Sequence, residues 1–240
     1  MCAHYEALRQ WEAYEKHFSV ERPLDPVQMP LHVYPMGQAP LIRRPAELDS
    51  GDEAVPARDL VLGHFGLLPG FAKDTKYGLR TYNARTETVD QLASFKHAWA
   101  KRRHCIIACE AIYEPDWRTD KHIPTRITRQ DGAPLGVAGL WSPWKDPSTG
   151  QWHNSFAMLT INADTHPIFK ELHRTDLKRP PDKQDKRMVV ILNDDAYDAW
   201  LDAPVEKSRE FFVQYPADRL LAMGMPTAPK PTKAAAMDQE

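Results

Sequence analysis

The stretch Cys105-Ile-Ile-Ala-Cys-Glu-Ala-Ile-Tyr-Glu-Pro115 is an apolar run bounded by charged residues. Such a run is typical of a buried strand. Cys105 and Cys109, with His104 beside them, also invite a metal interpretation. In a strand, however, four residues separate the two thiols by roughly 13 Å, which is too far for one tetrahedral ion. We therefore expect core thiols here, and neither a metal nor an organic cofactor.

The segments around this run predict a sheet of many short strands with a few helices. An amphipathic helix is expected over residues 4–18, a second over 90–103, and a short one through Trp200 and Leu201. Together these elements indicate one α+β domain over residues 1–225, built on a strongly curved sheet, with a disordered Ala/Pro/Lys-rich tail over 226–240. The other expected strands are Leu31–Tyr34, Leu41–Arg43, Leu60–Pro69, Leu135–Trp141, Phe156–Asn162 and Met188–Leu192.

The composition is that of a globular protein with no membrane span. Of the 240 residues 42% are hydrophobic, and no apolar run approaches the ~18 residues that a span needs. The three cysteines are an odd number and the opening residues do not resemble a signal peptide, so we expect a reducing cytoplasm. A net charge of −2 argues against indiscriminate binding to duplex DNA, although it permits a local basic groove.

Met1-Cys2 opens the chain, and removal of Met1 would leave an N-terminal cysteine. Its α-amine titrates near pH ~7.7–8.0 and its thiol near ~8.5. Together they can close a five-membered ring on an aldehyde, because the amine forms an imine and the thiol adds to it. The helix expected over residues 4–18 would begin just after Cys2, and its positive N-terminal pole would lower the thiol pKa.

Several motifs follow this terminus in a fixed order and span residues 1 to about 201. The set consists of Met1-Cys2, Phe65-Gly-Leu-Leu-Pro-Gly-Phe-Ala-Lys73, Asn83-Ala-Arg-Thr-Glu-Thr-Val89, Cys105 to Glu114, Ala138-Gly-Leu-Trp141, Asn162-Ala163 and Lys186-Arg-Met-Val-Val-Ile-Leu192. The ordered set resembles the SRAP family, the SOS-response-associated peptidases or abasic-site-processing proteins. Asn-Ala-Arg-x-Glu-Thr, followed by the Tyr-Glu strand, is its most specific part.

The resemblance implies a barrel-like, mostly antiparallel sheet with peripheral helices. It also implies an enzyme of the DNA-damage or SOS response that traps abasic sites in single-stranded DNA. In this family the N-terminal cysteine forms a thiazolidine with the ring-opened sugar aldehyde, and members are thought to remove their own initiator methionine by a peptidase reaction. We expect a monomer that associates with the nucleoid when DNA-bound, and no membrane or metal partner.

The resemblance also assigns the catalytic residues by position. Cys2 matches the crosslinking nucleophile, and Asn83 matches the asparagine that holds the N-terminal residue and the lesion. Glu114 matches the catalytic carboxylate. For the catalytic histidine His173 is favoured, because it follows a helical-looking segment and precedes an inserted loop over residues 174–185, and His166 is the alternative.

DNA contacts are expected from basic and aromatic side chains. The family's Cys-Gly-Arg start is Cys2-Ala3-His4 here, so a titrating histidine replaces a phosphate-binding arginine. Phenylalanines stand where the family has the tryptophans of its DNA wedge, with core packing the expected role of at least one of them. The predicted DNA-binding residues are His4, Arg43, Phe65, Phe71, Arg85 and Arg187.

Two other functions remain open from the sequence. One is a non-covalent single-stranded-DNA-binding module of the same fold, favoured by the change at His4 and the inserted loop. The other is a thiol peptidase that cleaves other proteins with Cys2 as its nucleophile. A nucleophile at residue 2 fits self-processing better than cleavage in trans.

Overall fold

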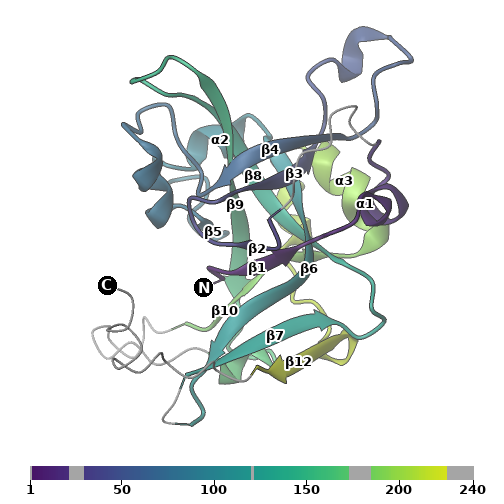
Figure 1. Ribbon diagram of the computed structural model, residues 1–240, viewed down its shortest axis with the longest axis vertical. Coiled ribbons are helices and arrows are strands. Elements are labelled where there is room, and N and C mark those ends of the chain that lie inside the picture. Colours follow the sequence, from purple (N-terminus) through teal and green to yellow (C-terminus); the bar gives the residue numbers. More distant parts are fainter. Residues whose placement is uncertain (1, 22–29, 120–121, 173–184, 226–240) are drawn as a thin grey trace, which may run out of the picture.

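The computed structural model describes residues 2–21, 30–119, 122–172 and 185–225 (Figure 1). The tail expected over 226–240 therefore lies outside the described residues. The central element is β6 (His104–Asp116), which confirms the strand expected over Cys105–Pro115. It pairs with β1, β3, β7 and β8, all antiparallel. Partner strands cover both edges of β6, and Glu110 is its only exposed residue, which agrees with its apolar sequence.

Within the described residues, β6 belongs to a single sheet of twelve strands. Five of its strands close on themselves in the order β8, β9, β4, β3, β6 and back to β8, which makes a barrel. Most pairs are antiparallel, and β4 and β5 pair with β9 in parallel. The expected α+β, barrel-like and mostly antiparallel fold is confirmed. The other strands are β1 (Tyr5–Ala7), β2 (His32–Val33), β3 (Gln38–Arg43), β4 (Asp59–Phe65), β5 (Asn83–Arg85), β7 (Ile123–Arg129), β8 (Leu135–Lys145), β9 (Trp152–Asn162), β10 (Arg187–Val189), β11 (Ile191–Leu192) and β12 (Leu220–Gly224).

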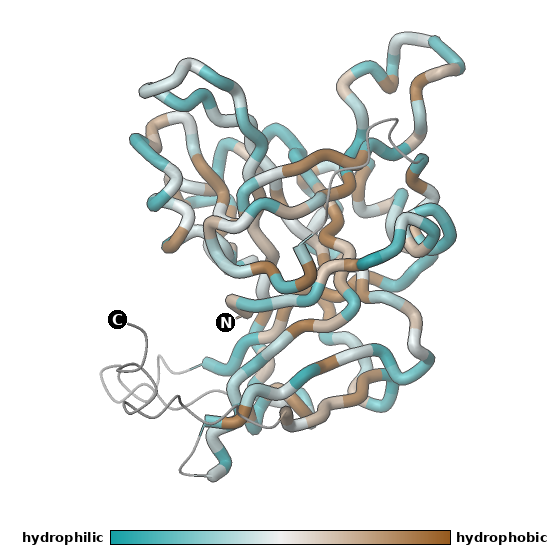
Figure 2. Tube along the Cα trace, in the orientation of Figure 1, coloured by the Kyte–Doolittle hydropathy of each residue, from teal (hydrophilic) through white to brown (hydrophobic). Residues whose placement is uncertain are grey.

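In the described part of the chain three short α-helices lie around the barrel, namely α1 (Trp11–Phe18), α2 (Lys96–Ala100) and α3 (Tyr197–Asp202). Short 3-10 helices occur at Leu48–Ser50, Thr75–Arg80, Phe169–Glu171, Asp194–Ala196, Ser208–Phe211 and Ala217–Arg219. Hydrophobic segments gather on the strands in the middle of the molecule (Figure 2). No helix among the described residues is long and apolar enough to cross a membrane.

Two of the expected helices are shorter than their patterns predict. Over residues 4–18 the first part is the strand β1, because its backbone pairs with β2 and β6, and α1 begins only at Trp11. Over residues 90–103 the helix α2 covers five residues, and hydrogen-bonded turns such as Leu92 N–H to Thr88 O precede it. In both places tertiary contacts override a helical pattern. The strands β7 and β12, which pair with each other, had no counterpart in the sequence analysis.

Candidate functional site

The N-terminal segment brings Cys2 into the interior of the protein. The strand β1 is held between β2 and β6, and Tyr113 of β6 donates its backbone N–H to the His4 carbonyl oxygen at 2.9 Å. Cys2 thus lies beside the Tyr113–Glu114 end of β6, and its exposed fraction is only 1%. Cys2 is therefore enclosed by the fold.

Asn83 reaches Cys2 from a different strand. It begins β5, which pairs in parallel with β9 and places Asn83 opposite Met158. Its Nδ2 donates a hydrogen bond to the Cys2 carbonyl oxygen at 2.7 Å. The amide is buried, so the bond is shielded from competing water. Two residues that are 81 positions apart are therefore joined directly.

Glu114 lies at the end of β6 and is 1% exposed. Burial raises the pKa of the Cys2 thiol, and the negative charge of Glu114 raises it further, so the two groups are close enough to interact. The expectation of a lowered thiol pKa was wrong. The helix dipole that was to lower it does not exist at this point, because residues 5–7 form a strand and α1 starts at Trp11.

Tyr82 is a residue of this site that the sequence analysis missed. Its ring is half-buried, and burial raises the pKa of its hydroxyl, with further contributions from the charges of Cys2 and Glu114. The ring also packs edge-on against Phe65. Its position directly before Asn83 was the only available signal. Cys2, Asn83, Glu114 and Tyr82 thus form one cluster, which we call the N-terminal site.

The catalytic histidine has two candidates, His166 and His173. His173 lies outside the described residues. His166 is buried, with Nε2 2.9 Å from the Tyr215 carbonyl oxygen. Its Nδ1 accepts the backbone N–H groups of Ile168 and Phe169. Both ring nitrogens are therefore engaged by the backbone, which fixes a neutral structural histidine and leaves no atom for proton transfer to a substrate.

His4 is held between two tyrosine rings. Its ring stacks on Tyr34 at a centroid distance of 4.3 Å and on Tyr113 at 4.1 Å, and its Nε2 lies 3.0 Å from Nδ1 of His32. Burial lowers the pKa of His4 to about 4, and His32 adds to the effect. At neutral pH His4 is therefore uncharged, so this placement does not support the expected role as a cationic phosphate contact.

Two of the other expected DNA contacts lie away from the open surface. Phe65 is fully buried, where it stacks on Phe156, so its ring is core, whereas Phe71 is 57% exposed. Arg43 ends β3 with its guanidinium 4.1 Å from the centre of the Trp141 ring, and its charge acts on the Cys105 thiol. Cys105 and Glu114 are nine positions apart along β6, a span of roughly 30 Å. Arg43 thus lies at the opposite end of β6 from the N-terminal site.

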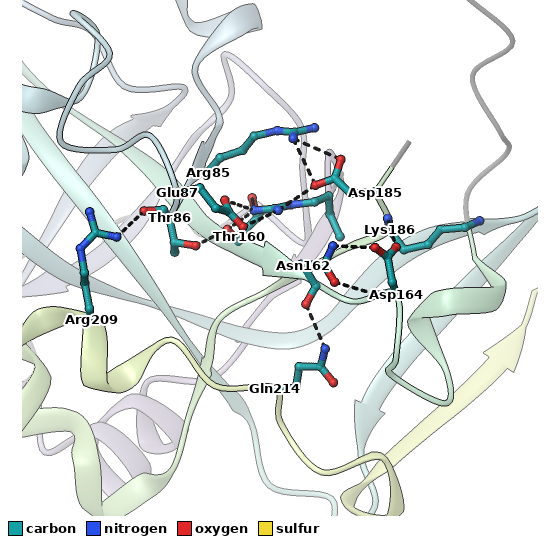
Figure 3. Close-up of polar contacts among 11 residues, drawn as sticks. Arg85, Thr86, Glu87, Thr160, Asn162, Asp164, Asp185, Lys186, Arg209 and Gln214 are labelled. Atoms are coloured by element: carbon teal, nitrogen blue, oxygen red, sulfur yellow. Dashed lines mark hydrogen bonds and ion pairs between the residues drawn. The ribbon is translucent and has the colours of Figure 1, made fainter. Parts of the chain in front are cut away.

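Arg85 and Arg187 meet at one carboxylate. The Arg85 guanidinium contacts Asp185 at 3.1 Å (Figure 3). Nη1 of Arg187 contacts the same carboxylate at 2.9 Å. Arg187 is buried, and Glu87 binds both of its Nη atoms at 2.8 and 2.9 Å. Both Nη atoms of Arg187 are therefore engaged by groups inside the protein. Arg85 has about a third of its side chain exposed and is the better placed of the two for a phosphate.

A pocket of about 330 Å³ adjoins the N-terminal site. Its walls come from the N-terminal segment, the loop after β2, the end of β6 and the start of β7. It is lined by Ala3, His4, Tyr34, Tyr113, Glu114, Pro115, His122 and Pro124. Within the described part of the chain, no group of three His, Cys, Asp or Glu side chains could hold a metal ion.

The model of the family described as SOS response associated peptidase (SRAP) matches residues 1–227. The chain belongs to the SRAP family. A Bacillus subtilis relative, abasic site processing protein YoaM, is 30% identical over 186 residues, which cover 73% of this chain and 74% of YoaM. The Xenopus tropicalis abasic site processing protein HMCES is 23% identical over 165 residues, and the match covers 60% of this chain but only 45% of HMCES.

Solved structures share the SRAP fold of this chain. A protein from Bordetella bronchiseptica superposes with a TM-score of 0.80 at 42% identity, over 94% of this chain and all of that one. A Bacteroides thetaiotaomicron protein gives a TM-score of 0.72 at 19% identity, over 94% of this chain and 92% of that one, which supports the fold alone.

Proposed function

We propose that this protein processes abasic sites in single-stranded DNA and that, once Met1 is removed, Cys2 bonds covalently to the ring-opened sugar. The observation that carries the proposal is the 2.7 Å hydrogen bond from Asn83 to the Cys2 carbonyl oxygen beside the buried Glu114. The names of the relatives support the same substrate. Residues 1–225, acting as a monomer, would carry the activity.

The covalent chemistry has two steps at Cys2. The α-amine attacks the aldehyde carbon, and loss of one water gives an imine. The thiol sulfur then adds to the imine carbon, and the thiol proton ends on the nitrogen, which closes the thiazolidine. Fixing the terminus by the Asn83 hydrogen bond makes both steps effectively intramolecular once DNA is bound.

Glu114 would shuttle the protons of these steps. The amine must lose a proton before attack, and the carbinolamine oxygen must gain one to leave as water. A carboxylate buried next to Cys2 can accept the first proton and return the second. The same carboxylate would activate a water molecule for hydrolysis of the Met1–Cys2 peptide bond. Opening of the cyclic sugar is assigned to His173.

The experiment uses Met1-free protein and a single-stranded oligonucleotide with one abasic site, separated on a denaturing gel. A shifted band whose intact mass equals protein plus DNA minus one water is expected. Cys2→Ala should abolish the band. Cys105→Ala, which removes a buried thiol remote from the N-terminal site, is the matched control and should retain it. Absence of the band with the wild-type chain would favour a non-covalent DNA-binding module.

A further inference from the structure

We propose that the rings of Tyr34, His4 and Tyr113 form a platform on which an unpaired nucleobase next to the abasic site stacks, with the outer face of Tyr34 as the contact surface. This inference rests on the proposed function, because it concerns the strand whose lesion reaches Cys2. We call the three rings the aromatic platform.

The aromatic platform is a continuous stack made of three separate segments. His4 precedes β1, Tyr34 follows β2 and Tyr113 belongs to β6. The planes of His4 and Tyr34 differ by 15°, and those of His4 and Tyr113 by 12°. Two rings that lie near 4 Å and almost parallel to a third occupy its opposite faces. His4 is therefore the middle ring, and Tyr34 and Tyr113 are the outer ones.

The stack is held in place before any ligand arrives. His4 is tied to His32 at 3.0 Å through its ring nitrogens. The Tyr113 hydroxyl donates to Glu6 at 3.2 Å, and Arg126 holds the same carboxylate at 2.9 Å. A rigid platform needs little ordering on binding, so more of the stacking energy contributes to affinity.

Tyr34 is the ring that remains open. Its exposed fraction is 53%, although one face of its ring stacks on the partly buried His4. The pocket of about 330 Å³ begins at this stack and continues to Glu114, so a group on Tyr34 lies beside the N-terminal site. The other lining side chains include two prolines and a histidine, which offer flat apolar surfaces.

The occupant follows from this chemistry. Among the described residues no lysine or arginine lines the pocket, and His4 is uncharged at neutral pH, so these residues offer a phosphate no guanidinium or ammonium partner. A nucleobase is flat and uncharged, and any of the four bases gains stacking energy on an aromatic face. The base must be free of a duplex partner to leave its own stack. An immediate neighbour of the lesion in single-stranded DNA meets these conditions.

The test measures binding of oligonucleotides that carry a single tetrahydrofuran residue, an abasic analogue without an aldehyde. Fluorescence anisotropy should show Tyr34→Ala binding about 5- to 150-fold more weakly than wild type. Tyr34→Phe keeps the ring and should bind like wild type. Trp152→Ala, which removes an exposed aromatic on β9, is the matched control and should bind like wild type. Circular dichroism checks that each variant is folded.

A second series replaces the base on the 5′ or the 3′ side of the analogue with another tetrahydrofuran. One of these oligonucleotides should bind wild type more weakly by the same factor as Tyr34→Ala, with no further loss in the variant. Equal losses in both proteins for both sides would overturn the platform. Crosslinking of wild type to a true abasic site is measured separately, so failure of the proposed function and failure of the platform give different results.

Discussion

Replacing Asn83 should slow the proposed crosslinking far more than it disturbs the fold. The side chain is buried, and its one hydrogen bond to the N-terminal segment joins Nδ2 to the Cys2 carbonyl oxygen at 2.7 Å. Asn83→Ala leaves that carbonyl oxygen without this donor, at a cost of about 1–3 kcal/mol. If this whole free energy is added to the cost of holding Cys2 in its reactive position, crosslinking slows by roughly 5- to 150-fold, at 1.36 kcal/mol per factor of ten.

The assay is single-turnover crosslinking of Met1-free protein in excess over an abasic oligonucleotide, with the rate read from denaturing gels. Asn154→Ala is the matched control, because its Nδ2 also faces a backbone carbonyl oxygen, that of Leu62 at 3.4 Å, away from Cys2. Asn83→Asp should be slower than Asn83→Ala, since it sets a carboxylate against the Cys2 carbonyl oxygen. A folded Asn83→Ala protein that crosslinks within twofold of wild type would refute the assigned role.

Three further results are expected. Glu114→Gln should slow crosslinking yet speed alkylation of the thiol by iodoacetamide, because the Glu114 charge contributes to raising the pKa of Cys2. Burial lowers the pKa of His104 from 6.5 to about 4, so as the pH falls below 6.5 the unfolded chain takes up a proton on this ring before the folded protein does. The free energy of unfolding should therefore have its full value above pH 6.5 and fall by about 3 kcal/mol as the pH approaches 4. His104→Phe should flatten this pH dependence, measured in urea titrations. Arg187→Met should lower the free energy of unfolding by about 3 kcal/mol, measured the same way, and Glu87→Gln should cost less because Glu87 is half exposed.

Local sequence patterns predicted the barrel strands well because the burial of a strand shows directly as a run of apolar residues. The run at Cys105 is apolar because β6 is buried along most of its length, and this burial can be read from consecutive residues. The strand β1 is different. Glu6 is buried within it, and the compensating partners Tyr113 and Arg126 are more than a hundred positions away. No pattern within residues 4–18 reveals those partners, and the helical spacing of Tyr5 and later aromatics misleads.

The candidate site divides in the same way. Cys2, Asn83 and Glu114 were predictable as a set only through the ordered motifs of a family, and the structure adds the hydrogen bond that joins two of them. The aromatic platform had no such signal. Tyr34 lies in a proline-rich stretch, and only folding brings its ring onto His4. Because His4 is then enclosed and neutral, its chemistry changes from that of a cation to that of a stacking ring.

The burial of Cys2 determines the order in which its two nucleophiles can act. Burial and the neighbouring Glu114 raise the pKa of the thiol, so at neutral pH the sulfur is protonated and a weak nucleophile. An α-amine, which titrates near ~7.7–8.0, is partly unprotonated there and attacks the aldehyde first. The imine then holds its carbon next to the sulfur, where proximity replaces intrinsic reactivity. A thiol peptidase acting on other proteins needs the opposite arrangement, an accessible thiolate, and a sulfur that is 1% exposed with a raised pKa argues against it.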